Sequence, residues 1–171
     1  MKLVVILFCL LTINAIGQKI SSCACRGIID PDYKGFVSIY DKPNGITTKS
    51  IKHDLKNEDY LVFKIDKVTD SFFHVKLEYA INGKSFQGWI SKSKHLITYL
   101  RNYDSAISLY SKYNTSSKVK AVIPSSSSSS FQIIDCKENW IYIKEIIRKS
   151  HKSEGWLKSE DQCANPYTTC S

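Results

Sequence analysis

The stretch Gly88-Trp89-Ile90-Ser91-Lys92 returns 67 residues later as Gly155-Trp156-Leu157-Lys158. Each copy closes a segment of short, strand-like runs, and further matching blocks precede both copies. Residues 38–44 match 108–114 at an offset of 70, and residues 72–76 match 140–144 at an offset of 68. Because the order is kept while the offset drifts, the sequence predicts two copies of one small domain whose loops differ in length.

The runs between these blocks have the period of two that is typical of β-strands. Leu61, Phe63 and Ile65 share one face of their run, and Asn82-Gly83 is a strong hairpin signal. Helical periodicity is almost absent. The predicted fold class is therefore all-β, with two small barrels in tandem. Residues 118–123 are predicted to form a short strand in the second copy, for which the first copy offers no convincing equivalent.

The N-terminus predicts export. Lys2 precedes the apolar run 3–11, and Ala15-Ile16-Gly17 supplies small residues for cleavage, so residues 1–17 are interpreted as a signal peptide. The apolar run is too short to be a retained membrane anchor, and no second run approaches the length of a transmembrane segment. Residues 20–23 loosely resemble a lipobox, which leaves a lipid anchor at Cys23 as an alternative that the charge of Lys19 disfavours.

The mature chain divides into four predicted parts. They are an N-terminal segment (18–30), a first domain (31–100), a second domain (101–162) and a cysteine-bracketed tail (163–171). The formal net charge of the full sequence is +8, and such an excess of positive charge can attract anionic polymers. The lysines are scattered, as on solvated strand faces, and export argues against a nucleic-acid partner.

Five cysteines remain after removal of the signal peptide. Cys163 and Cys170 enclose a short loop that a disulfide could close in an oxidising compartment. Cys23, Cys25 and Cys136 are an odd number, so either of the first two could pair with Cys136. Lipidation of Cys23 would instead let the other four pair completely. Since no further Cys or His lies at zinc-ligand spacing around Cys23 and Cys25, no metal is predicted.

Three short patterns, in the same order in both copies, resemble bacterial SH3-like (SH3b) domains. The opening strand reads Val37-Ser38-Ile39-Tyr40 and Ile107-Ser108-Leu109-Tyr110. The middle strand is 72–76 and 140–144, and the closing strand is the Gly-Trp-aliphatic stretch. The resemblance covers nearly the whole mature chain. The tail from Gly155 through Cys163 to Cys170 is similar to that of exported SH3-domain proteins of Bacteroidota. It implies five-stranded barrels that bind extended ligands, commonly peptidoglycan peptides or partner proteins, without catalysis. The long connections 46–58 and 115–130 depart from the family pattern.

The alternation of side chains between the two faces of each strand predicts where a binding groove would lie. If Phe73 and Ile141 face the core, their neighbours face outward. The predicted groove consists of aromatic residues suited to a stiff, extended peptide: Tyr40, Phe72, Tyr110, Trp140 and Tyr142. The same rings could instead pack under loops or between the copies. Trp89 and Trp156 are assigned to packing between the repeats.

Catalytic chemistry finds no support in the sequence. The four histidines do not cluster, and no paired carboxylates or nucleophile–base arrangement is recognisable. We therefore expect a secreted or periplasmic, non-catalytic module, with no cofactor, that binds cell-envelope peptide, peptidoglycan or an extended protein. The alternative is a structural or inhibitory protein–protein interaction module with no small ligand.

Overall fold

The computed structural model describes residues 19–101, 105–125, 127, 129–146, 153–168 and 170. The described chain is built of strands and one short 3-10 turn, η1 (Ser159–Asp161), which confirms the all-β prediction. The predicted signal peptide lies outside the described residues. The strands are β1 (Ser21–Ile29), β2 (Val37–Tyr40), β3 (Thr47–Ile51), β4 (Leu61–Val68), β5 (Phe72–Tyr79), β6 (Ser85–Ser91), β7 (Leu96–Leu100), β8 (Ile107–Tyr110), β9 (Val119–Ile123), β10 (Phe131–Lys137), β11 (Trp140–Glu145), β12 (Glu154–Leu157) and β13 (Gln162–Cys163).

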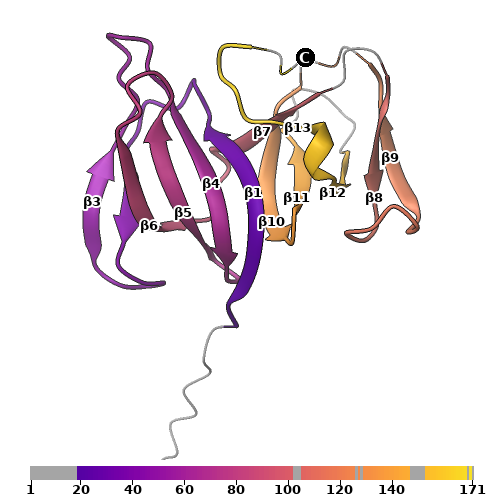
Figure 1. Cartoon of the computed structure of the whole chain (residues 1–171), viewed down its shortest axis with the longest axis horizontal. Coiled ribbons are helices and arrows are strands. Elements are labelled where there is room, and N and C mark those ends of the chain that lie inside the picture. The colour runs from indigo at the N-terminus through magenta and orange to yellow at the C-terminus, as the bar shows by residue number, and fades with distance from the viewer. Residues whose placement is uncertain are drawn as a thin grey trace, which may run out of the picture.

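The named strands form one antiparallel sheet with the order β3-β2-β6-β5-β4-β1-β7-β10-β11-β12-β8-β9, and β13 pairs with β7. The path does not close on itself, because β3 and β9 lie at its two ends. Figure 1 shows β2–β6 on one side of the molecule, β8–β12 on the other, and β1 and β7 between them. We call β2–β6 the first half and β8–β12 the second half.

The two halves have the same topology. The order β3-β2-β6-β5-β4 becomes β9-β8-β12-β11-β10 when each strand is replaced by its counterpart in the second half. Irregularities in pairing recur at matching places, after Ile39 and Leu109 and after Ile65 and Ile133. The sequence repeat therefore corresponds to a repeat of backbone structure.

The glycines of the Gly-Trp stretch have a shared structural reason. A Cβ atom added to Gly88 would lie 2.9 Å from the Tyr40 carbonyl oxygen, and one added to Gly155 would lie 2.9 Å from that of Tyr110. Each glycine thus lets the opening strand of its half approach the closing strand closely.

The strand of residues 118–123 does have an equivalent in the first half, contrary to the sequence prediction. β3 pairs with β2 as β9 pairs with β8, and Ile51 and Ile123 occupy matching buried positions. The sequence hides β3 because the first four of its five residues are exposed. An edge strand that faces solvent on both sides has no alternating pattern to detect.

β1 joins the halves, although its sequence was assigned only to an N-terminal segment. It pairs with β4 along most of its length and with β7 at Ile28 and Ile29, and β7 pairs in turn with β10. A Cβ atom on the buried Gly27 would lie 2.5 Å from both the Phe63 and Ile133 side chains. Core residues of both halves therefore close over the backbone of β1.

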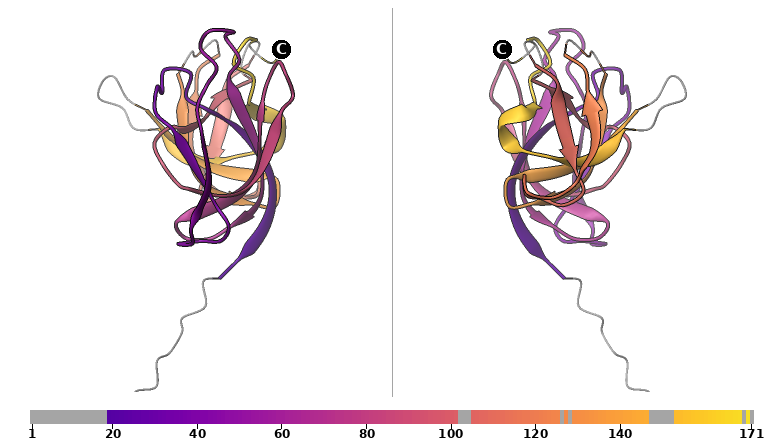
Figure 2. Two further views of the ribbon diagram at one scale, coloured as in Figure 1. Left: turned by 90° about the vertical axis from the view of Figure 1, so that its left-hand side faces the viewer. Right: turned by 90° about the vertical axis from the view of Figure 1, so that its right-hand side faces the viewer.

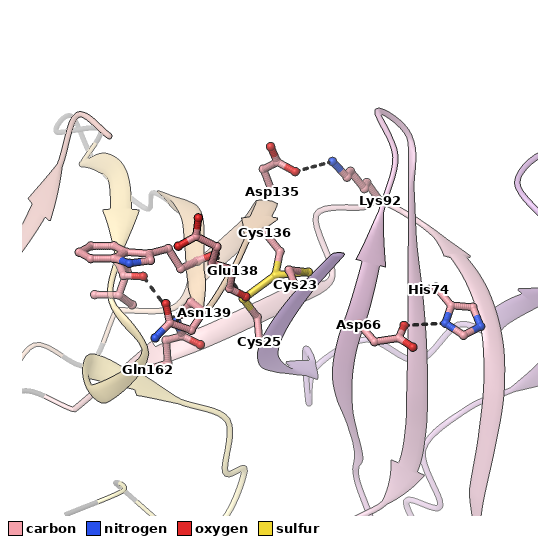
Figure 3. Close-up of a disulfide and its surroundings, with 12 residues drawn as sticks. Cys23, Cys25, Asp66, His74, Lys92, Asp135, Cys136, Glu138, Asn139 and Gln162 are labelled. Carbon is pink, nitrogen blue, oxygen red and sulfur yellow. Dashed lines mark hydrogen bonds and ion pairs between the residues drawn. A yellow bond between two sulfur atoms is a disulfide. The ribbon is translucent and has the colours of Figure 1, made fainter. Parts of the chain in front are cut away.

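Further contacts tie the halves together. Lys92, which follows β6, forms an ion pair with Asp135 of β10 at 3.1 Å (Figure 3). Cys163 and Cys170 form the disulfide predicted for the tail. The Tyr167 hydroxyl, inside that loop, donates to the Glu58 carbonyl oxygen at 2.7 Å. The two turned views in Figure 2 show β1 curving along the side of the molecule. Within the described ranges, no helix is long and apolar enough to cross a bilayer.

Candidate functional site

Each half carries aromatic side chains on the outer side of three neighbouring strands. In the first half Trp89 of β6 lies opposite His74 on β5 and Tyr40 on β2. In the second half Trp156 of β12 lies opposite Tyr142 on β11 and Tyr110 on β8. Directly opposed residues point to the same side of a sheet. We define the first aromatic face as Tyr40, Phe72, His74 and Trp89, and the second as Tyr110, Trp140, Tyr142 and Trp156.

One pair of rings is built alike in both faces. Tyr40 meets Phe72 edge to face with centroids 5.7 Å apart, and Tyr110 meets Trp140 in the same way at 5.7 Å. Phe72 and Trp140 are only 7% and 9% exposed. The prediction that these two rings face solvent is therefore wrong. The tyrosine packed against each ring helps to cover it, and large rings gain most from such burial.

The faces differ at their tryptophans. Trp89 is buried, whereas Trp156 is half-buried. Trp156 also has ring neighbours on both sides, Tyr113 at 5.6 Å and Tyr142 at 5.5 Å. We call Tyr113, Trp156 and Tyr142 the ring row. The residue that matches Tyr113 in the first half is Pro43, so that half has no counterpart to the full row.

Positive charge flanks the ring row at both ends. The Lys137 ammonium lies 4.6 Å from the Tyr113 ring centroid, and that of Lys120 lies 5.5 Å from the Tyr142 centroid. Lys120 also pairs with Glu154 at 3.0 Å, and the Tyr142 hydroxyl donates to the same carboxylate. The hydrogen bonds from Lys120 and Tyr142 lower the pKa of Glu154. This arrangement holds Tyr142 beside Trp156 and leaves Lys137 for a ligand carboxylate.

The assignment of Trp89 and Trp156 to packing between the repeats needs correction. Their ring contacts are with His74 in the first half and with Tyr113 and Tyr142 in the second. β6 and β12 are each separated from the central strands by two others in the sheet. β1, β7 and β10 join the halves instead.

A groove of about 140 Å³ lies at the edge of the first aromatic face. Of the residues predicted to bind a ligand, Tyr40 lines this groove. The sequence analysis missed Tyr33, Phe36 and His95, which also line it. The Tyr33 and His95 rings stack at 3.8 Å, and Phe36 is 59% exposed. Ligand pockets usually have volumes of about 300–1,000 Å³, so this groove fits one side chain rather than an extended ligand.

A second hollow of about 500 Å³ is polar, and sequence reasoning missed it entirely. Arg26 of β1 and Arg101, just after β7, line it together with Ser159, Gln162 and Asn165. Neither guanidinium forms an ion pair with a described residue. Guanidinium groups recognise carboxylates with paired hydrogen bonds. The hollow therefore suits an anionic group.

No protein-family model matches this chain, and none of the curated proteins does.

Proposed function

We propose that the protein is an exported, non-catalytic binding module whose second aromatic face holds an extended cell-envelope peptide or peptidoglycan fragment. The ring row carries the proposal. Three adjacent, half-buried rings, with Trp156 edge to face against both tyrosines, offer apolar contacts to an extended chain. Lys137 at one end of the row suits a ligand that bears a carboxylate. The arginine-lined hollow is a second place where a carboxylate would be favoured.

The proposal includes two SH3-like units. The repeated strand order, the paired bulges and the ordered sequence patterns support this assignment for each half. The disulfides support export, because such bonds persist in oxidising compartments. A position in the periplasm or outside the cell is part of the same proposal.

Co-sedimentation with purified cell-wall sacculi tests this function. The mature chain should pellet with sacculi, and soluble peptide fragments of the same wall should release it. Tyr113→Ala should weaken retention at least several-fold, whereas Tyr40→Ala in the first half should leave it nearly unchanged. A protein that stays in the supernatant at micromolar concentration would refute the proposal.

One observation favours the alternative, a protein–protein interaction module. β9 is an end strand of the sheet, and its Val119 and Val122 are 42% and 59% exposed. An apolar edge strand can accept a strand from a partner. Val122→Lys would abolish such pairing and leave retention on sacculi intact, so this substitution separates the two functions.

A further inference from the structure

Three cysteines meet where β1 passes the hairpin between β10 and β11 (Figure 3). Cys23 and Cys25 stand two residues apart in β1, and Cys136 lies 111 residues after Cys25. Their sulfur atoms all lie within 4.8 Å of one another. The Cα atom of Cys136 is 6.0 Å from that of Cys23 and 6.6 Å from that of Cys25. Both separations fall within the usual range for a disulfide, so Cys136 can bond to either partner.

The local backbone presents both cysteines of β1 to Cys136. The pairing of β1 with β4 shifts register between Ser22 and Cys25, which gives β1 one extra residue there. Such bulges bend a strand and redirect its side chains. The N–H group of Ala24, between the two cysteines, donates to the Glu138 carbonyl oxygen in the hairpin turn. This bond holds the bulge against the hairpin that carries Cys136.

The two candidate partners lie in different environments. Cys25 is 2% exposed, and its sulfur lies 3.2 Å from the Trp140 carbonyl oxygen, to which a thiol there donates. Cys23 is half-buried. If Cys23 bonds to Cys136, the remaining thiol is buried and has a hydrogen-bond acceptor. If Cys25 bonds to Cys136, the remaining thiol is that of Cys23, at the surface.

We propose that these cysteines form an exchangeable disulfide that exposes Cys23 as a site of covalent modification by low-molecular-weight disulfides. The Cys25 thiolate attacks the sulfur of Cys136, the Cys25–Cys136 bond forms, and the Cys23–Cys136 bond breaks. Cys23 leaves as a thiolate and takes up the proton that Cys25 lost to solvent. The number of disulfides and thiols is unchanged, so this step needs no external oxidant or reductant.

The modification step is a second exchange. The Cys23 thiolate attacks one sulfur of a small disulfide, forms a mixed disulfide with it, and releases the other half as a thiolate. The small molecule is thereby reduced to one free thiol per protein modified. This site is separate from the ring row, and the proposal does not depend on peptide binding.

Three thiolates so close together are also potential ligands for a soft metal ion. The structure favours disulfide exchange, because Cys163 and Cys170 of the same chain are bonded. A compartment that oxidises that pair also oxidises Cys136 with one of its neighbours. Only one of the three cysteines then remains a thiol, and a metal site of three sulfur ligands cannot form.

The test uses the full mature chain, purified under oxidising conditions, with oxidised glutathione as the probe. Intact mass should show two disulfides and one thiol, and incubation should add one glutathione at Cys23. As the probe concentration is raised, the rate of modification should reach a plateau, because exchange then becomes rate-limiting. Cys25→Ser should abolish modification, since it leaves Cys23 bonded to Cys136. The double variant Cys163→Ser/Cys170→Ser should retain both the site and the plateau.

Other outcomes overturn the proposal. A rate that rises in proportion to probe concentration, without a plateau, means a permanently free Cys23. Modification at Cys25, or none before denaturation, means a buried thiol that does not exchange. A mass showing three reduced cysteines with a bound metal ion identifies a metal site. A lipid on Cys23 in protein from the native host removes the thiol altogether.

Discussion

The two halves of this molecule share a backbone and differ in the surface built on it. The features repeated most closely maintain packing: the glycines of the Gly-Trp stretch, and an edge-to-face pair of rings with the same 5.7 Å spacing. The divergent features lie beside the tryptophan. His74 contacts the buried Trp89 and pairs with Asp66, whereas Tyr142 and Tyr113 flank a half-buried Trp156.

Under the proposed function, the two halves have different roles. In the first half the tryptophan, Trp89, is buried. This half also pairs with β1 through β4 and contacts the C-terminal tail through Tyr167. The second half leaves its rings accessible between two lysines. The proposed function places ligand binding in the second half, so substitutions at matched positions are expected to have unequal effects.

The largest effect is expected where the halves meet. Gly27→Val would place methyl groups into the Phe63 and Ile133 side chains, which belong to opposite halves. Overpacking of this kind costs about 3 kcal/mol or more when neither side can yield. Circular dichroism should show that both halves lose their fold together. Ala24→Val, at an exposed position of the same strand, is the control, and independent survival of one half would contradict a shared core.

The matched tryptophans should separate stability from binding. Trp89→Ala should lower the free energy of unfolding by about 3 kcal/mol, because a nearly buried ring leaves a cavity. Trp156→Ala should cost roughly 1–2 kcal/mol, because less of its ring is removed from water, yet it should abolish binding to sacculi. Urea denaturation and co-sedimentation measure the two effects. Equal losses of stability, with binding kept in both variants, would contradict the assignment.

Acid should weaken the first half through His53. Its Nδ1 atom accepts from the Leu61 N–H, its Nε2 atom meets the Asp30 carbonyl oxygen, and burial lowers its pKa. As the pH falls below the usual histidine pKa of about 6.5, the unfolded chain therefore binds a proton at His53 more readily than the folded chain does. The free energy of unfolding consequently decreases as the pH drops from about 7 toward the lowered pKa. Burial lowers the pKa of His95 as well. His53→Gln should reduce the slope of melting temperature against pH between 7 and 5; an unchanged slope would show that His53 is already charged.

The smallest effect is expected at Glu154, whose matched residue in the first half is Gln87. Glu154→Gln removes the ion pair with Lys120, and such exposed pairs contribute only about 0.5 kcal/mol. The lowered pKa of Glu154 means that its contribution is present at neutral pH and is lost in acid. The stability curves of variant and parent should therefore start to converge as the pH falls below the usual glutamate pKa of about 4.3, and should meet only below the lowered pKa of Glu154. A constant difference down to pH 3 would indicate a packing effect instead.

The sequence predicted those parts of the fold that bury an alternating face. The core positions Phe73 and Val75 of β5, and Ile141 and Ile143 of β11, are fully buried as the alternation predicted. β1 and β3 were missed for opposite reasons. β3 is exposed on both sides, whereas the core-facing part of β1 includes a glycine covered by side chains from elsewhere, so neither shows the expected period.

The candidate site was predicted less completely. Tyr40, Tyr110 and Tyr142 lie on the aromatic faces as expected, but alternation could not show that Phe72 and Trp140 would be covered by tyrosines from other strands. Tyr113 lies in a turn, where strand periodicity does not apply. The meeting of Cys136 with Cys23 and Cys25 depends on the path of β1 past the second half, and no short-range pattern records that path.

The most direct test compares the affinities of two substituted proteins for soluble cell-wall peptide fragments by calorimetry. Tyr113→Ala/Tyr142→Ala dismantles the ring row, and Tyr40→Ala removes the matched face of the first half. Since each aromatic contact contributes about 0.5–1.5 kcal/mol, loss of two rings should weaken binding by at least about fivefold. Tyr40→Ala should bind within about twofold of the parent. Unchanged affinity in a folded double variant, or a larger loss in Tyr40→Ala, would contradict the assignment of binding to the second half.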